Sequence, residues 1–150
     1  MENPKLKYEG RATLKRKASL RTLTNKLDGI FSRYIRYSHA DGRGNCSCFT
    51  CDKVAPVAEM DCGHFVGRQH RSTRWEEKNC HPQCRFCNRY CEGRKDVYAV
   101  RLVEKYGPHI LFELQEMKNS IVKLTPADLE EKIAHYKAKL AEFAPEKQAA

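Results

Sequence analysis

The chain has no hydrophobic run close to the ~20 residues that a membrane-spanning helix needs. Its start, Met1 to Lys5, lacks the charged-then-apolar pattern of a secretory signal, and the sequence contains no internal repeat. The one low-complexity stretch is the tail at 145–150, which we expect to be disordered. These absences predict a protein that stays in the cytosol and has no membrane partner.

Acidic residues are scarce beside basic ones: 19 Asp and Glu against 28 Lys and Arg give a formal net charge of +9. A surplus of this size indicates a polyanionic partner, and nucleic acid is the first candidate. The 150 residues suffice for one domain with its own core, or for helical arms around a small metal-stapled centre. We expect one compact domain with helical extensions.

Cysteine, in contrast, is plentiful, and in a reducing compartment eight cysteines favour metal binding over disulfides. Four form two Cys-x-x-Cys pairs, Cys48 with Cys51 and Cys84 with Cys87. Each tight turn offers two sulfurs, so two turns complete the shell of one tetrahedral structural Zn²⁺. The other four are either buried packing residues or further ligands, and one of them is an alternative to Cys48 in the first pair: Cys46, Cys62, Cys80 and Cys91.

The pattern of apolar residues divides the chain into five parts. Residues 1–18 form a basic arm that either settles on phosphates or remains a solvated tail. An amphipathic helix follows at 19–40, capped by Ser19, and the turn cluster at 41–45 ends it. The zinc-binding core takes 41–107, and the helices at 108–144 precede the tail at 145–150.

Inside the core, residues 46–66 predict two short strands, the second of which ends at His64. The polar, basic run at 67–74 predicts an exposed loop. A short helix from Cys84 to about Cys91 would then place Cys84, Cys87 and Asn88 on one face. This order predicts an α+β fold with a small zinc-stapled ββα-metal core, mostly helical overall.

Three further helices are expected, at 96–106, at 109–120 and from Thr125 to 144. The last is the best marked, because Thr125 can cap it, Pro126 suits its first position and Asp128 can complete a capping box. Its apolar stripe is either core packing or a dimer contact, and consists of Leu129, Ile133, Tyr136 and Leu140.

The pairs also enclose groups that suit phosphodiester cleavage. Hydrolysis needs a base that deprotonates water and a cation that takes up the developing charge. His64 can supply the base, since neutral imidazole is available near physiological pH. Asn88 and the phosphate offer the oxygen ligands that Mg²⁺ or Mn²⁺ prefers, which leaves the thiolates to zinc.

These residues resemble the HNH or His-Me finger nucleases, and more narrowly the lambdoid phage NinG (Rap) recombination endonucleases. The resemblance runs from about Cys48 to Gly107, and its most specific parts are the two cysteine pairs, Gly63-His64-Phe65, Thr73-Arg74-Trp75 and Asn79-Cys80-His81-Pro82-Gln83-Cys84. It implies that His64 is the general base, that Asn79 braces the loop that orients it, and that Asn88 binds the catalytic metal.

The sequence departs from the common HNH pattern directly before the base, where Gly63 replaces an acidic metal ligand. The nearest acid is Asp61, which on an ideal strand shares a face with Gly63 rather than with His64. Asp61 is therefore a second, weaker candidate for the catalytic metal. Without it, Asn88 would hold Mg²⁺ with phosphate oxygens and waters.

Positively charged residues surround these motifs and would hold a DNA backbone without reading its sequence. Trp75 is either a core residue or a base-stacking wedge. His81 either binds phosphate, caps the short helix or packs. The candidate DNA-binding residues are Arg68, Arg71, Arg74, His81, Arg85, Arg89, Arg94 and Lys95.

The resemblance implies a metal-dependent endonuclease that cuts branched DNA, such as Holliday junctions and flaps, in phage recombination. It also implies a phage-encoded protein in a bacterial cytoplasm. A homodimer would suit a two-fold junction. Two alternatives stay open: a zinc-ribbon DNA-binding accessory protein without catalysis, and an HNH nicking enzyme that acts on linear duplex in DNA packaging.

Overall fold

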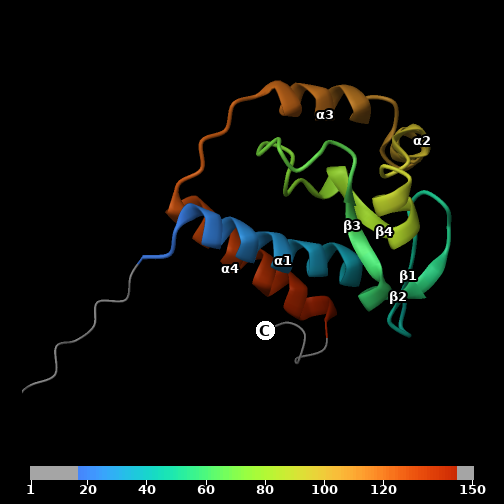
Figure 1. Ribbon diagram of the computed structural model, residues 1–150, viewed down its shortest axis with the longest axis horizontal. Coiled ribbons are helices and arrows are strands. Elements are labelled where there is room, and N and C mark those ends of the chain that lie inside the picture. The colour runs from blue at the N-terminus through green and yellow to red at the C-terminus, as the bar shows by residue number, and fades with distance from the viewer. Residues whose placement is uncertain (1–16, 145–150) are drawn as a thin grey trace, which may run out of the picture.

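The computed structural model describes residues 17–144, so the expected basic arm and tail lie almost wholly outside the described residues. The fold is α+β, as predicted, with two small sheets between helices (Figure 1). No helix in the described part combines the length and apolar character needed to cross a membrane. The elements are α1 (Leu20–Ser38), β1 (Asn45–Ser47), β2 (Val54–Pro56), η1 (Val57–Glu59), β3 (Met60–His64), η2 (Glu77–Asn79), β4 (Cys80–Cys84), η3 (Phe86–Tyr90), α2 (Lys95–Tyr106), α3 (Ile110–Asn119) and α4 (Pro126–Phe143).

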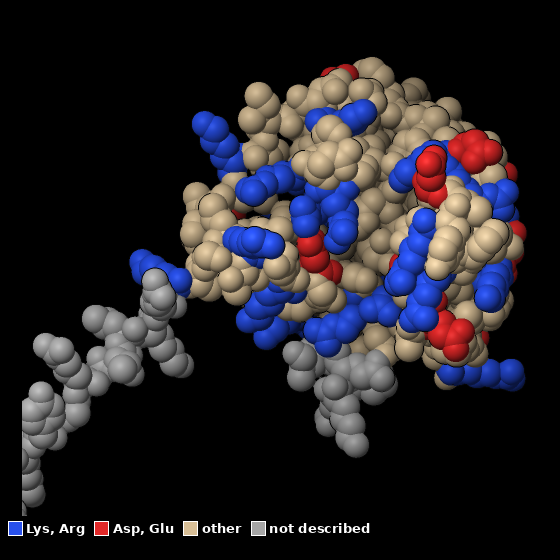
Figure 2. All heavy atoms as spheres, viewed as in Figure 1, with Lys and Arg blue, Asp and Glu red and all other residues tan. Residues whose placement is uncertain are grey.

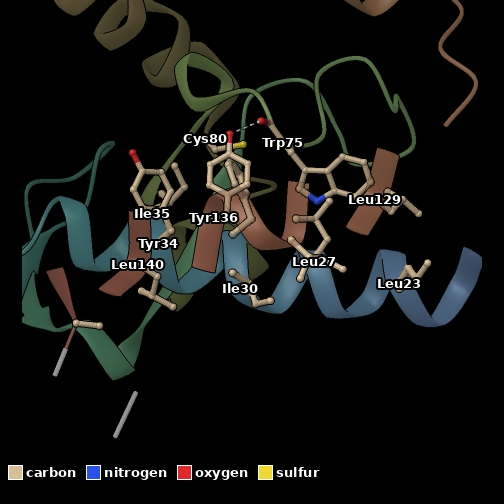
Figure 3. Close-up of a cluster of buried hydrophobic side chains, with 13 residues drawn as sticks. Leu23, Leu27, Ile30, Tyr34, Ile35, Trp75, Cys80, Leu129, Tyr136 and Leu140 are labelled. Carbon is tan, nitrogen blue, oxygen red and sulfur yellow. Dashed lines mark hydrogen bonds between the residues drawn. The ribbon is translucent and has the colours of Figure 1, made fainter. Parts of the chain in front are cut away.

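The first and last helices, α1 and α4, pack side by side although they lie at opposite ends of the chain (Figure 1). Ser19 caps α1, and Thr125 with Asp128 forms the predicted capping box of α4. The apolar stripes of both helices meet in one core, where the Tyr136 hydroxyl also donates to the Trp75 carbonyl (Figure 3). The α4 stripe is therefore core packing within one chain, and the dimer-contact alternative for it is wrong.

The centre of the fold is an antiparallel hairpin of β3 and β4, in which His64 lies opposite Cys80 and Gly63 opposite His81. One face of this hairpin packs on α1. β4 was not predicted: a helix was expected to begin at Cys84, where the strand in fact ends, and the short helix, η3, is π-helical and starts at Phe86. β4 contains Pro82, which is tolerated there because a two-stranded sheet has only edges.

Residues 46–66 hold three strands rather than the predicted two, because β1 and β2 pair with each other before β3 begins. The predicted exposed loop at 67–74 is exposed at Arg68 and Arg71, but Thr73 is fully buried and Arg74 is half-buried. The prediction was wrong for those last two residues because the loop folds back onto the hairpin.

Gly63 is required by the register of the hairpin. A Cβ atom at this position would lie 2.1 Å from Oε1 of Gln83, the β4 residue two pairs further along, opposite Asp61. The Gln83 side chain cannot move freely, because its Nε2 donates to Thr50 Oγ1 at 3.0 Å and to the Gly93 carbonyl at 2.8 Å. This close approach explains why position 63 holds no acidic residue.

Gly63→Ala should therefore destabilise the protein by about 1–3 kcal/mol, as expected for overpacking in a filled interior. Gly29→Ala is the matched control, because Gly29 lies on α1 with no atom within 4 Å of an added Cβ. It should stabilise by about 0.5–1 kcal/mol, since alanine is the better helix former. Urea unfolding of both variants measures the difference, and equal stabilities would contradict the assigned register.

Candidate active site and metal centre

The predicted zinc ligands lie together. The Sγ atoms of Cys48, Cys51, Cys84 and Cys87 are all within 4.8 Å of one another, and those of Cys51 and Cys84 are 3.8 Å apart. Zn–S bonds near 2.3 Å in a tetrahedron also place sulfurs ~3.8 Å apart. The cluster can therefore hold a zinc ion. Cys46 is buried nearby but is not among the four cysteines whose sulfurs converge, which favours Cys48 over Cys46 as the ligand of the first pair.

A zinc ion here would join two parts of the core. Cys48 and Cys51 belong to the β1–β2 hairpin, whereas Cys84 ends β4 and Cys87 lies in η3. Asn88 follows Cys87 directly, so the same ligand set fixes where η3 presents Asn88. A zinc ion bound here would therefore also position Asn88.

His64 ends β3 and is half-buried. Its Nε2 lies 2.9 Å from the Arg74 carbonyl oxygen, and its Nδ1 lies 3.3 Å from the Cys62 carbonyl oxygen. A neutral ring carries one N–H, and the shorter contact favours Nε2 as the donor, which leaves a lone pair on Nδ1. Burial lowers the pKa of His64, and the charge of Arg68 lowers it further. The ring is therefore neutral near pH 7, as a base must be.

Asn79 braces the loop that carries the Arg74 carbonyl, in the way that the resemblance implied. Its buried Oδ1 accepts from the Val66 amide at 2.7 Å, and its Nδ2 donates to the carbonyls of Val66 at 2.9 Å and Thr73 at 3.0 Å. The loop is therefore closed across both of its ends. Asn79 is fully buried, so its contacts are positioning contacts.

Asp28 on α1 fixes the same loop from outside, and the sequence analysis did not single it out. Its carboxylate accepts from the Arg74 guanidinium at 2.5 and 2.9 Å and from Trp75 Nε1 at 2.9 Å. Both members of the Asp28–Arg74 pair are mostly buried, which distinguishes it from a solvated surface pair. The sequence signal for this role is that Asp28 directly follows Leu27, a residue of the apolar stripe of the predicted helix.

A further cluster of candidate residues links Asp61 on β3 to Asn88 and Arg89 on η3. The Asp61 carboxylate accepts from Asn88 Nδ2 at 3.0 Å and from Arg89 through two contacts of 2.7 Å. Partial burial opposes ionisation of Asp61, but the bonds from Arg89 and Asn88 outweigh it and lower the pKa. Asp61 thus stays ionised beside Asn88.

Asp61, His64 and Asn88 all line one groove of about 660 Å³. Residues of α1 also line it, including Asp28 and Arg36. The ideal-strand argument separated Asp61 from His64, but the structure brings both to the same groove.

The predicted DNA-binding residues fall into two sets. Arg68, Arg85 and Arg89 line the groove with exposed side chains. The remaining basic residues do not line it: Arg71 is exposed on the loop, Arg74 is paired with Asp28, Arg94 precedes α2, and Lys95 donates to the His64 carbonyl. Figure 2 shows Lys and Arg side chains spread over the left and lower parts of one face, where Asp and Glu are few.

His81 cannot bind phosphate in this structure, because it is fully buried. Its Nδ1 lies 3.0 Å from the Tyr98 hydroxyl and its Nε2 lies 2.9 Å from the Tyr106 hydroxyl. Burial, with the charge of Lys105, lowers the pKa of His81 to about 2, so the ring stays neutral. The packing alternative is therefore correct. Tyr98 also donates to the Gly63 carbonyl, which ties the hairpin to α2.

Trp75 is buried and belongs to the core, so it is not the base-stacking wedge. Exposed aromatic side chains lie elsewhere. On η3, Phe86 is 66% exposed and Tyr90 is 79% exposed, and their rings lie 6.4 Å apart at 30°. In the sequence Phe86 directly follows Arg85 and Tyr90 directly follows Arg89, and both arginines line the groove. Sequence analysis missed this pair, although two aromatics four residues apart on a short helix are a usable signal.

Comparison with known proteins gives a family match over nearly the whole chain. A family model described as Bacteriophage Lambda NinG protein matches residues 2–146. Protein ninG of Escherichia phage 933W is 29% identical over 73 residues, which is 48% of this chain and 36% of the relative. Protein ninG of Salmonella phage P22 is 30% identical over 69 residues, 45% of this chain and 34% of the relative. The aligned segment thus spans only about a third of these curated relatives. No solved structure matches.

Cys84→Ser should lose the zinc ion and lower the unfolding temperature, because the binding energy of a structural zinc site is folding energy. Cys91→Ser is the control, since Cys91 is not one of the four clustered cysteines. After dialysis against metal-free buffer, elemental analysis should find one zinc per chain in the wild type and in Cys91→Ser, and none in Cys84→Ser. Full stability of zinc-free protein would contradict the four-cysteine site.

Proposed function

This chain belongs to the NinG family of bacteriophage lambda, and on that premise we propose that it is a metal-dependent DNA endonuclease that cuts branched DNA in phage recombination. The observation that carries the proposal is the convergence of His64, Asp61 and Asn88 on one basic groove. A neutral histidine, an ionised carboxylate and a free amide oxygen are the groups that hydrolysis of a phosphodiester needs.

His64 would act as the general base through Nδ1. The Nε2–H bond to the Arg74 carbonyl holds the ring and fixes this tautomer. Water attacks phosphorus as its proton passes to Nδ1, the bond from phosphorus to the 3′ oxygen breaks, and that oxygen takes up a proton from solvent water. The products are a 5′-phosphate and a 3′-hydroxyl.

Asp61 and Asn88 would hold the catalytic Mg²⁺ or Mn²⁺. Asn88 donates to Asp61 through Nδ2, so its Oδ1 remains available as a hard ligand beside the carboxylate. The ion would stabilise the charge that develops on the phosphate oxygens. Gly63 contributes no ligand, because the Gln83 side chain fills the space of a Cβ there.

The groove arginines would position the DNA backbone. Arg68, Arg85 and Arg89 line the same groove as the candidate catalytic groups, and contacts from such residues to phosphates carry no sequence information. Arg89 also forms an ion pair with Asp61. An arriving phosphate would therefore compete with Asp61 for Arg89, and an arriving metal ion would compete with Arg89 for Asp61. This exchange would couple substrate binding to assembly of the site.

Selectivity for branched DNA is supported by Phe86 and Tyr90. Exposed aromatic faces stack on bases that have left the duplex, and such bases occur at branch points. The pair lies on η3, the element that carries Asn88, so a base stacked there would be close to the metal ligands. A homodimer would let two such sites cut a two-fold junction in pairs.

The test is cleavage of matched four-way, flapped and linear DNA with Mg²⁺ or Mn²⁺. The wild type should cut the branched substrates, and His64→Ala should cut at least about 100-fold more slowly, because a general base is lost. Junction binding by His64→Ala should stay close to that of the wild type. His135→Ala is the control, since His135 lies on α4 and outside the groove.

Each alternative gives a different result. A zinc-ribbon accessory protein would bind junctions and cut none of the substrates at any metal concentration. An enzyme that nicks linear duplex in DNA packaging would cut linear and branched DNA equally. Robust cutting by His64→Ala would exclude His64 as the base.

An added pair of variants tests the basis of branch selectivity. Phe86→Ala with Tyr90→Ala should reduce the preference for junctions over linear DNA, while leaving cutting of linear DNA little changed. Phe112→Ala is a matched control, because Phe112 on α3 is also 66% exposed but lies outside the groove. An unchanged preference in the double variant would remove the aromatic pair from the proposal.

A further inference from the structure

A second set of metal-binding side chains lies at the groove, apart from the four-cysteine cluster. The Sγ atoms of Cys62 and Cys80 and a ring nitrogen of His64 all lie within 4.8 Å of one another. Cys62 and His64 come from β3, and Cys80 lies directly opposite His64 on β4. The register of the hairpin therefore produces the set.

The chemistry of these donors suits a thiophilic ion. Two thiolates and an imidazole are a ligand set that zinc uses in sites with an open fourth position. In a tetrahedron with Zn–S near 2.3 Å and Zn–N near 2.0–2.1 Å, neighbouring donors lie ~3.5–3.8 Å apart. The observed spacing thus needs only small side-chain adjustments. Cys80 is fully buried, whereas Cys62 and His64 line the groove, so the fourth position faces the groove.

We propose that Cys62, His64 and Cys80 form a second zinc site, and that its occupancy switches off the candidate nuclease. The binding site itself does not depend on the proposed function; the inhibitory effect does. The ion would compete with catalysis because it binds His64, the residue proposed as the base.

The contacts of His64 indicate how the switch acts. Its Nε2 and the Cys80 thiol share one acceptor, the Arg74 carbonyl, at 2.9 and 3.9 Å, so the Nε2 edge of the ring faces that thiol. Zinc on Nε2 displaces the proton there. The proton of the neutral ring then resides on Nδ1, where the Cys62 carbonyl at 3.3 Å can accept it. In that tautomer Nδ1 cannot accept a proton from water.

Cys62 and Cys80 could also lie close together because they only pack in the core, or because they form a disulfide. These two cases predict different measurements. Both cysteines pack against the core beneath α1, and packing requires no second metal. Two neighbouring thiols that oxidise to a disulfide lose two hydrogens and bind no metal. Zinc stoichiometry and the intact mass of the unreduced protein separate these two cases from the second zinc site.

The experiment equilibrates full-length protein with buffered micromolar free Zn²⁺ under reducing conditions and counts bound zinc by elemental analysis. The wild type should gain a second equivalent, and Cys62→Ser with Cys80→Ser should keep only the first. Cys91→Ser should gain the second as the wild type does. Cys62→Ser alone provides the answer if serine at the buried position 80 prevents folding, and it should lose the second equivalent as well.

The coupling to His64 is measured separately from activity. The ¹⁵N resonances of the His64 ring should move from an Nε2–H to an Nδ1–H pattern as the second zinc binds. In cleavage assays the same zinc should inhibit the wild type and spare Cys62→Ser with Cys80→Ser, each compared with its own zinc-free rate. A wild type that stops at one equivalent, or a mass two hydrogens low, would overturn the second site whether or not the protein proves to be a nuclease.

Discussion

The hydrogen bond from His64 Nε2 to the Arg74 carbonyl joins the end of β3 to the loop that follows it, and the orientation of the imidazole depends on whatever fixes that carbonyl. Asn79 holds the loop from inside through Val66 and Thr73. Asp28 holds it from outside through Arg74 itself. A hairpin, a loop and a helix thus meet at one peptide group, and burial of the surrounding side chains keeps water from replacing the bond.

The two halves of the candidate site rest on different supports. The α1–α4 pair fixes the histidine half, because Asp28 lies on α1 and Tyr136 of α4 bonds the Trp75 carbonyl (Figure 3). The cysteine cluster fixes the half that carries Asn88, because Cys87 precedes Asn88 on η3. β3 belongs to both halves, since it carries Asp61 and His64. Loss of zinc should therefore disturb Asn88 more than His64.

Sequence predicted well those features that depend on local chemistry. The periodic helices, the Thr125–Asp128 capping box and the cysteine pairs follow from spacing alone, and the structure confirms them. Asn79 came from the resemblance, and its hydrogen bonds hold the loop that contacts His64. His64 was singled out by its place between the cysteine pairs, and its role as a base stays a prediction. β4 was missed because every residue from Cys80 to Cys84 is buried, which leaves no alternation to detect.

Features that depend on tertiary contacts could not be predicted. The exclusion of a side chain at Gly63 depends on Gln83, twenty residues later in the chain, and the role of Asp28 depends on Arg74 across the fold. His81 looked like a phosphate ligand beside basic residues, yet two tyrosines of α2 enclose it. In each case the contacting residue is distant in the sequence, so neither periodicity nor motif spacing indicates the contact.

The candidate site depends most directly on the tautomer of His64, which ¹⁵N NMR of the protein with one bound zinc can measure. We expect a neutral ring near pH 7 with its proton on Nε2 and a bare Nδ1. We also expect a pKa of His64 below the usual ~6.5 of histidine, because burial disfavours the charged form. A ring protonated on Nδ1 alone, or one that is still doubly protonated at neutral pH, would contradict it.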